Sequence, residues 1–467
     1  MLDPAKAPLL PVEPHEGIAP VAVAGDATAA RLVSESLRAT ILRVALPAVA
    51  SSLLMTLFSS VDAFWVGMRI GAAGLAAVST SLFWIWMIVS LAEMIGVGLT
   101  AAAARRYGEG RGGEAARLAG DALVFSTVLG AAVAIAGTGA LAWIFAVMNT
   151  PPEVTALGTT YLRTYLFGAP FIYAFFAIDS AFRAAGDTRT PFVLLLASVA
   201  LTLVLDPVLI LGLGPFPRLG IAGAAIATIS TRGAAALMGL GIAIRRRLVA
   251  LGRVRLESIL LVCRVGLPTA ATGMTFSAIY VILTRTTTRF GTPALAALGI
   301  GHRVESWLFM IGVGFGAATA AIVGQNLGAG RPDRAERAGW MATYYCTALG
   351  VVAFALELVI PRQFASLFTT DAAVIDEAVR YLRIAAVSQL AVCSEVVLEG
   401  ALGGAGETVP PMIASTALTA SRIPLAAWAA NRWGSSGIWW VISLTAMARG
   451  IAMAALWRVG RWKRRSL

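Results

Sequence analysis

The chain has 467 residues, of which 58% are hydrophobic and 13% are charged. A soluble domain carries roughly twice that share of charge, so the composition excludes an ordinary water-soluble protein and indicates one embedded in a bilayer. The net charge of +12 lies mostly in arginines beside apolar stretches, which is typical of a topology signal and of attraction to anionic lipid; no separate basic domain exists to bind nucleic acid.

Residues 1–38 come first; they are rich in proline and alanine and lack an apolar run preceded by basic residues. This composition predicts a disordered cytoplasmic tail rather than a cleaved signal peptide. Beyond it, about twelve stretches reach the ~20 apolar residues that a helix needs to cross ~30 Å of hydrocarbon. The expected spans are 39–66, 75–104, 118–145, 156–182, 190–213 and 220–244 in the first half, and 264–290, 295–324, 339–361, 376–402, 411–431 and 437–457 in the second.

Residues 245–263 join the two halves and place apolar residues such as Leu248 and Leu256 among arginines. That mixture predicts an amphipathic helix that lies on the cytoplasmic surface of the membrane. After the last span, residues 458–467 form a short basic tail.

Arginine and lysine mark alternate loops along the chain. Such loops face the cytoplasm under the positive-inside rule. The basic positions are Arg105, Arg106, Arg111, Arg117, Arg183, Arg189, Arg245, Arg246, Arg247, Arg253, Arg255, Arg331, Arg334, Arg337, Arg458, Arg461, Lys463, Arg464 and Arg465. The intervening loops hold few, so we expect both termini in the cytoplasm and the chain in the cytoplasmic (inner) membrane.

The second half repeats the first at a spacing of 220 residues. Positions 182–192 read FRAAGDTRTPF, and positions 402–412 read LGGAGETVPPM. A period of this length is one half of a duplicated domain, far above the 20–50 residues of solenoid repeats. In an apolar chain it predicts an all-α secondary transporter with a six-helix lobe over 39–244, a pseudo-twofold related lobe over 264–457, and a substrate site between them.

The sequence contains no motif for catalysis or for ATP-driven transport. The chain has two histidines, His15 and His302, and no GxxxxGK[ST] run to hold nucleotide phosphates. A zinc site or a histidine-based catalytic constellation is therefore excluded, and we expect neither enzyme activity nor a cofactor. Transport must then be driven by an ion gradient or be passive.

Acids at membrane depth are the remaining candidates, since each costs ~2.5–3.5 kcal/mol to insert and so needs a reason to be there. They are Asp62, Glu93, Asp179, Asp206, Glu305, Glu357, Glu395 and Glu399. Asp62 and Asp206 have no acidic counterpart in the second half, where Asp206 falls on Ile423. Function is expected where the halves differ. The alternative for each acid is an arginine partner or an interfacial position.

Asp206 directly precedes Pro207, and Thr202 lies one helical turn earlier on the same face. The proline kinks the helix and can leave upstream carbonyls free to coordinate a cation. A carboxylate pair with a threonine hydroxyl can serve either H⁺ or Na⁺. Asp62, Asp206 and Thr202 are therefore candidate ligands of a coupling ion.

Four runs together resemble the multidrug and toxic compound extrusion (MATE) family. They are RVALPAVASSLLMTLFSSVDAFWVG from Arg43, RAAGDTRTP from Arg183, LDPVLILG from Leu205 followed by GIAGAAIAT from Gly220, and IVGQNLGAGRPDRAERA from Ile322. The likeness covers about residues 40–457. It implies a twelve-helix antiporter whose two six-helix lobes form a V and which exports amphipathic organic cations in exchange for inward H⁺ or Na⁺.

On that resemblance, the family's acid of helix one falls on Asp62 and the acid of its LDP segment falls on Asp206, with a polar residue at Thr202. The asparagine that is common at the end of helix four is Asp179 here, which adds a charge and a further candidate for ion coupling. Some members carry a glutamate in helix seven. The seventh span here contains no acid, and Glu305 on helix eight cannot simply inherit that role.

Residues and resemblance lead to one mechanism. Asp62 and Asp206 share a buried pocket, and an ion bound there removes the charge that attracts a cationic substrate, so ion and substrate compete. Aromatic and acidic side chains are expected to contact the substrate. The candidates are Phe58, Trp65, Trp84, Trp86, Phe175, Phe176, Glu305 and Glu399. We expect the protein to function as a monomer in the lipid bilayer.

Two other functions stay open. A flippase for lipid-linked oligosaccharides or related lipids has a similar two-lobe plan and needs a basic cavity, for which Arg285, Arg422 and Arg449 are available. An integral membrane enzyme that modifies lipids is the third possibility, but the chain offers no nucleophile–base pair or metal cluster for it. The four acids of the first half favour a cationic cargo.

Overall fold

The computed structural model describes residues 31–70, 72–147 and 151–465, and within these ranges the chain forms helices joined by turns and loops, without strands. The helices are α2 (Leu37–Ile70), α3 (Ala72–Gly108), α4 (Gly112–Val147), α5 (Pro152–Phe167), α6 (Ala169–Ala184), α7 (Arg189–Leu211), α8 (Ile221–Arg245), α9 (Leu256–Thr287), α10 (Gly291–Gly328), α11 (Pro332–Val359), α12 (Pro361–Ser366), α13 (Ala372–Gly404), α14 (Val409–Ala420) and α15 (Arg422–Val459), with short 3-10 helices at Thr288–Phe290 and Arg461–Arg464. The expected all-α fold is confirmed.

The described helices make twelve membrane passes. Ten stretches are long and apolar enough to cross a bilayer, and α5 and α6 together add a span that is broken by a bend of 50°. One of the ten, Val409–Val459, contains two passes because α15 turns back at Gly434, where φ is 62°. A Cβ on Gly437 would lie 2.4 Å from the carbonyl oxygen of Ala429. A continuous helix cannot make that contact, because eight residues rise ~12 Å along its axis.

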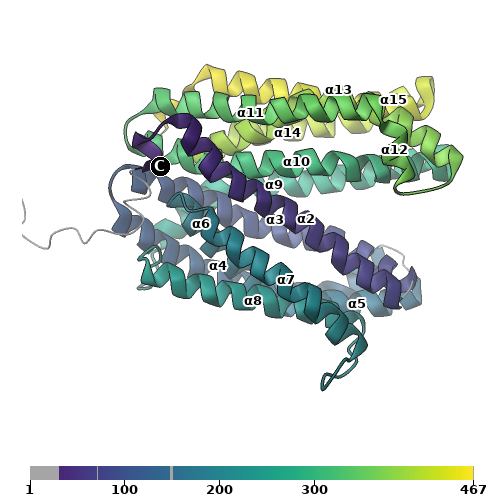
Figure 1. Cartoon of the computed structure of the whole chain (residues 1–467), viewed down its shortest axis with the longest axis horizontal. Helices are drawn as coiled ribbons and strands as arrows, with labels where there is room; N and C mark the ends of the chain where they lie inside the picture. The colour runs from purple at the N-terminus through teal and green to yellow at the C-terminus, as the bar shows by residue number, and fades with distance from the viewer. Residues whose placement is uncertain (1–30, 71, 148–150, 466–467) are drawn as a thin grey trace, which may run out of the picture.

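Two lobes follow the two halves of the sequence (Figure 1). Helices α4 to α8 group in the lower part of the view, and α9 to α15 group in the upper part. Helices α2 and α3 run along the boundary: α2 packs against α7 of its own lobe and α10 of the other, and α3 packs against α9 and α10. The interface between the lobes is therefore built mainly by the first two spans of each half.

The turns after the fourth spans show that the repeat is structural. Gly186 and Gly406 both adopt a left-handed conformation, with φ of 87° and 80°. The amide after each glycine donates a hydrogen bond to the carbonyl oxygen five residues earlier, at 3.0 Å for Asp187 and 2.9 Å for Glu407. The same residue pattern therefore forms the same helix-ending turn in both lobes.

Each lobe also closes with the same ion pair, which we call its terminal clasp. The guanidinium of Arg246, directly after α8, lies 2.7 Å from the carboxylate of Asp187. Arg465, after the last helix of the second lobe, lies 3.1 Å from Glu407. Each clasp ties the end of a lobe to the loop that follows its fourth span.

Glycines bring the backbones of the two lobes into contact near the arginine-rich loops. A Cβ added at Gly98 in α3 would lie 2.1 Å from the carbonyl oxygen of Val262 in α9, and one added at Gly266 would lie 1.8 Å from that of Met94. Glycine alone permits this approach, because a Cβ would overlap the facing backbone. The lobes are closed at this glycine seam and diverge toward the opposite end, at the right of Figure 1.

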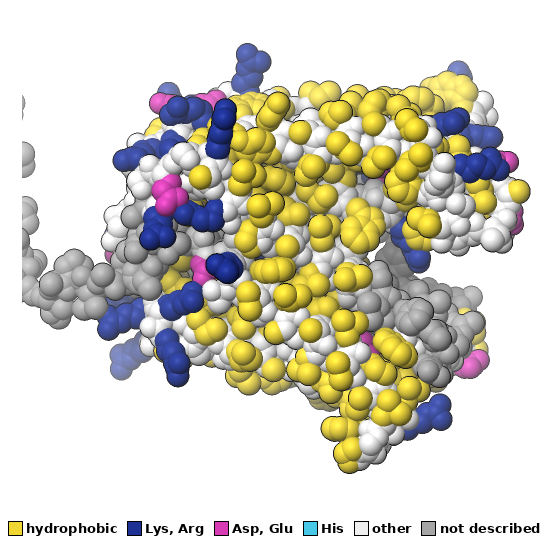
Figure 2. Space-filling view, in the orientation of Figure 1, with side chains coloured by type: hydrophobic (Ala, Val, Ile, Leu, Met, Phe, Trp, Pro, Cys, Tyr) yellow, Lys and Arg dark blue, Asp and Glu magenta, His cyan; other side chains and the backbone are white. Residues whose placement is uncertain are grey.

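The charges on the surface follow the arginine pattern of the loops. Figure 2 shows Lys and Arg side chains gathered at the left-hand end, where Figure 1 places the C-terminus, while the middle of this face is largely hydrophobic. An apolar belt between polar ends is the surface that a multi-pass membrane protein presents to lipid.

The expected amphipathic helix over 245–263 is wrong. Helix α8 ends at Arg245, residues 246–255 form an irregular loop, and α9 already begins at Leu256. Leu248 and Val249 are buried in the core of the first lobe instead of lying on a membrane surface. Several arginines of like charge would also repel one another along a helix at this place.

The expected disordered tail over 1–38 extends too far into the chain. Residues 31–34 form a helical turn, and Leu32 is fully buried. Arg331 donates a hydrogen bond to the carbonyl oxygen of Val33 at 3.0 Å, so this segment packs against the start of α11. The part of the expectation that concerns residues 1–30 lies outside the described residues.

The glycine seam leads to a prediction about stability. Replacing Gly266 with alanine places a Cβ on the backbone of Met94 and forces α3 and α9 apart. We expect a loss of ~1–3 kcal/mol, as in other overpacked sites, seen as a lower thermal midpoint of the purified protein in detergent. Gly241→Ala is the matched control, because nothing lies within 4 Å of a Cβ there. Equal midpoints for the two variants would contradict a tight seam.

Candidate functional site

The first lobe buries an acid beside a proline inside a helix. Asp206 is fully buried on α7, which continues through Pro207 to Leu211. Thr202 lies one turn earlier on the same helical face, and its hydroxyl is 2.7 Å from that of Thr231 on α8. The structure thus brings Thr202 and Asp206 together in the core of the lobe and adds Thr231, which the sequence had not singled out.

Asp62 was expected to share this pocket. Its backbone lies in α2, which packs along α7. Its side chain lies outside the described residues, so the pairing of Asp62 with Asp206 stays a prediction.

Asp179, a further candidate for ion coupling, has an arginine partner. Its carboxylate lies 2.8 Å from Nε of Arg183, one turn later on α6. An arginine partner is the alternative to a functional role that was considered for every acid in the spans. An ion that bound Asp179 would have to compete with this tethered guanidinium.

A buried arginine, Arg232, follows Thr231 on α8. Its side chain is 7% exposed, and its Nη2 lies 2.9 Å from the sulfur of Met55. Its guanidinium lies 5.3 Å from the ring centre of Phe58 and 5.7 Å from that of Phe175. Among the described residues, no carboxylate lies within 4.0 Å of it. Two aromatics expected to contact a substrate cation therefore face a cation of the protein itself.

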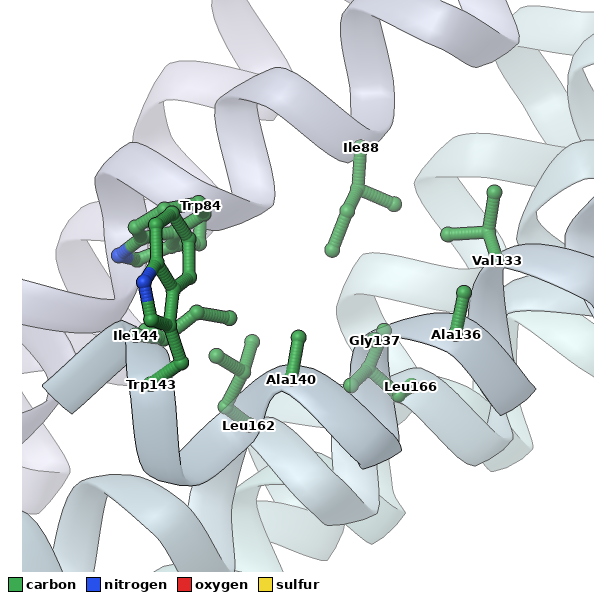
Figure 3. Close-up of a pocket in the computed structure, with 10 residues that line it drawn as sticks. All are labelled: Trp84, Ile88, Val133, Ala136, Gly137, Ala140, Trp143, Ile144, Leu162 and Leu166. Atoms are coloured by element: carbon green, nitrogen blue, oxygen red, sulfur yellow. The ribbon is translucent and has the colours of Figure 1, made fainter.

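The other aromatic candidates belong to apolar surroundings. Trp65 and Phe176 pack against the core of the first lobe, and Trp86 is exposed on α3. Trp84 lines a pocket of about 260 Å³ between α3, α4 and α5, beside Trp143 (Figure 3). The residues around this pocket are Trp84, Ile88, Val133, Ala136, Gly137, Ala140, Trp143, Ile144, Leu162 and Leu166. Since none of them ionises, this pocket is no ion site.

The second lobe contains one buried ion pair and several acids with other partners. Glu395 on α13 and Arg449 on α15 form an ion pair at 2.9 Å, and both side chains are buried. Glu305 accepts a hydrogen bond of 3.0 Å from the hydroxyl of Tyr381. Glu399 is half-buried, and within the described part of the chain no basic side chain lies within 4.0 Å of it.

Arg422 is fully buried and completes this polar network. Its Nε donates to the hydroxyl of Thr445 at 2.7 Å, its Nη1 donates to that of Tyr280 at 3.1 Å, and its Nη2 donates to the carbonyl of Ile442 at 3.3 Å. Arg422 and Arg449 are thus held by the protein itself, and a basic cavity for pyrophosphate loses two of its three expected arginines.

The repeat contains a signal that could have revealed Arg232. Thr228, Arg232 and Gly233 return as Thr445, Arg449 and Gly450, 217 residues later. Pro207 returns as Pro424 at the same spacing. Arg232 is therefore the first-lobe counterpart of Arg449.

Comparison with known proteins supports the whole architecture. The model of the MatE family matches residues 47–208 and 268–428. The chain is 30% identical to the probable multidrug resistance protein NorM of Deinococcus radiodurans, over 90% of this chain and 94% of that protein. It is 27% identical to the FAD transporter of Shewanella oneidensis, again over 90% of this chain and 94% of that protein.

Solved structures agree at the level of the fold. A crystal structure of MATE in the straight conformation matches with a TM-score of 0.85 and 24% identity, over 92% of this chain and 97% of that one. A MOP superfamily transporter from Pyrococcus furiosus, described as having a binding pocket of reverse polarity, matches with a TM-score of 0.86 and 23% identity, over 93% and 98% of the two chains.

The Glu395–Arg449 pair leads to a second prediction about stability. Glu395→Leu leaves a buried guanidinium without its counterion, so we expect a loss of about 3–5 kcal/mol in the free energy of unfolding. Removing both charges in Glu395→Leu/Arg449→Met should restore most of it. Glu399→Gln, which breaks no ion pair, is the control. Thermal midpoints of the four proteins decide the matter: a double variant no more stable than Glu395→Leu alone would show that the pair is not coupled.

Proposed function

Because the chain belongs to the multidrug and toxic compound extrusion (MATE) family of transporters, we propose that it is an antiporter that exports amphipathic, mainly cationic organic compounds in exchange for inward H⁺ or Na⁺. Its relatives include proteins named for multidrug resistance and one named for FAD transport. Membership alone therefore does not fix the cargo. The proposal for a cation and for ion coupling rests on the acids of the first lobe.

The single observation that carries the proposal is the burial of Asp206 next to Pro207 in the first lobe. A carboxyl group at membrane depth costs free energy to insert, which makes it a candidate functional residue. The second lobe has Ile423 at the matching position before Pro424, so the twelve-helix fold forms without this acid. Its presence in one lobe only is what an ion-coupling site predicts.

The proposed mechanism is competition between ion and cargo. Asp206, with Asp62 and the hydroxyl of Thr202, takes up H⁺ or Na⁺ and thereby loses its net negative charge. A cationic cargo in the cleft between the lobes is then held less tightly and leaves. Carboxylate and hydroxyl oxygens suit both ions, so the residues favour neither.

The glycine seam assigns this conformation to one state of the proposed export cycle. The lobes are closed at the arginine-rich end, which is the cytoplasmic side under the positive-inside rule. The conformation is then open toward the outside, where cargo is released and the ion enters. Export also requires an inward-open state, in which the contacts of Gly98 and Gly266 have separated. We place the protein in the cytoplasmic membrane as a monomer with both termini inside.

The polar network of the second lobe argues against the flippase alternative. Arg422 and Arg449 have protein partners, while Arg285 alone is exposed. A pyrophosphate-bearing lipid would have to displace those partners. Transport of a lipid-linked oligosaccharide by the purified protein, without export of any organic cation, would establish the flippase function instead.

The central test removes the acid of the first lobe. In liposomes with an imposed H⁺ or Na⁺ gradient, we expect Asp206→Asn and Asp62→Asn to abolish export of a labelled organic cation. The Asp206→Asn protein should still bind the cation, more weakly, because Asp62 remains, but added ion should no longer release it, because the paired site has lost one of its two carboxylates.

Glu357→Gln is the matched control for this test. Glu357 is also a buried acid, but it lies in the second lobe and accepts a hydrogen bond from Gln389 at 2.8 Å, which a glutamine can keep. Export should persist in this variant. If Asp206→Asn releases the cation on addition of ion as the wild type does, coupling resides elsewhere and the assignment is wrong.

Topology offers an independent check. A reporter that is active only in the cytoplasm should work when it is fused after Leu467, and one that is active only outside should not. Reporters placed in the loop between α7 and α8 should give the opposite pattern, because that loop lies at the other end of its helices. A C-terminal signal from outside would overturn the orientation and the export direction.

A further inference from the structure

Arg232 is the buried charge that the proposed mechanism does not use. A guanidinium carries five N–H donors, and among the described residues the recorded acceptor for Arg232 is the thioether of Met55, a weak one. The central carbon of the guanidinium lies over two aromatic rings, those of Phe58 and Phe175. Within the described part of the chain, this buried arginine therefore has no carboxylate at ion-pair distance to offset its cost of burial.

The second lobe shows what such a partner looks like. Arg449, the counterpart of Arg232, is buried to the same degree, 8% against 7% exposed. It lies 5.7 Å from the ring of Phe276, which is on the first helix of its lobe just as Phe58 is. It differs in having the carboxylate of Glu395 at 2.9 Å.

The residue that replaces this carboxylate in the first lobe is Phe175. Phe175 and Glu395 are 220 residues apart, the spacing that relates the fourth spans of the two lobes, as in Asp179 and Glu399. The first lobe therefore keeps the arginine of the pair and substitutes an aromatic ring for the acid. The other nearby acid on the fourth span, Asp179, is held by Arg183.

We propose that Arg232 is an anion subsite in the first lobe, which binds the carboxylate or phosphate of an amphipathic compound whose aromatic or apolar part packs on Phe58 and Phe175. The anion takes the place at the guanidinium that the side chain of Glu395 takes in the second lobe. Arginine suits this role because its planar group binds an oxyanion with two parallel hydrogen bonds while its faces stack on aromatic rings. The carboxylate or phosphate of such a compound would lie at Arg232, whatever other charge the compound carries.

The inference deepens the proposed export function, and it rests on that function only in calling the bound anion part of a cargo. The anion itself can come from a soluble compound or from the phosphate of a lipid head group. Binding is therefore measured without any ion gradient, on full-length protein in uncharged detergent, with 1-naphthylacetate as the anionic probe and 1-naphthylacetamide as its uncharged match.

The wild type should bind the carboxylate probe about tenfold more tightly than the amide, the size expected of a hydrogen bond to a charged group. Arg232→Met should abolish this preference, and Arg232→Lys should keep part of it. Phe175→Glu should abolish it as well, because it supplies a tethered carboxylate as Glu395 does. Phe175→Leu, which removes the ring and adds no charge, should retain the preference and serves as the control.

Phe175→Glu keeps the test decisive if Arg232→Met fails to fold, since it adds the missing partner and removes no charge. Equal affinity of the wild type for acid and amide overturns the proposal, as does an undiminished preference in Phe175→Glu. Loss of the preference on addition of phosphatidylglycerol assigns the subsite to a lipid head group, and its persistence assigns it to a soluble cargo. Since no gradient is used, a failure of ion-driven export leaves this result standing. Equal probe affinities beside intact export refute the subsite alone.

Discussion

An ionised side chain in the interior of a bilayer has no water to solvate it, and the buried charges of this protein are arranged under that constraint. The second lobe meets the constraint internally. Glu395 and Arg449 neutralise each other, and Arg422 is surrounded by hydroxyl and carbonyl oxygens. The first lobe also buries two ionisable side chains, Asp206 on α7 and Arg232 on α8, and among the described residues no carboxylate lies at ion-pair distance from Arg232. The two lobes of one fold therefore differ in how they hold their buried charges, and the sites that we propose for ion and anion both lie in the first lobe.

This difference between the lobes bears on the proposed coupling. The repeat supplies two lobes with matching turns, terminal clasps and a shared interface of first and second spans. On the proposed function, uptake of the ion in the first lobe shifts the balance between the conformations that meet at the glycine seam, while the Glu395–Arg449 pair of the second lobe stays formed.

Large parts of the fold were predictable because their causes are local. A span needs ~20 apolar residues, so the twelve passes could be read from composition, and the repeat placed them in two lobes. The linker was harder, since Leu248 and Val249 among arginines fit a surface helix as well as a loop with buried anchors. Long-range packing against α4 decided between them, through the bond from the amide of Ala250 to the carbonyl of Ala116 at 2.9 Å.

Those parts of the candidate site whose residues lie close together in the sequence were predictable, and those whose residues lie far apart were not. Asp206, Pro207 and Thr202 are neighbours on one helix, so their grouping follows from helical spacing. The partner of Asp179 is also local, four residues on at Arg183. Arg232 was missed because a lone arginine in an apolar span looks like a topology signal. Its meaning appears only when Phe175 and Glu395 are compared through the repeat and seen in space.

The terminal clasps bear on how the molecule is made. The Arg246–Asp187 pair can form as soon as residue 246 has left the ribosome, before any span of the second lobe exists. Each half of the chain therefore contains the ion pair that closes its own lobe. The two lobes can then fold one after the other during synthesis. The loop that follows α8 is then a natural place to divide the gene: two separately encoded halves would each close their own lobe and meet at an interface of backbone-to-backbone contacts.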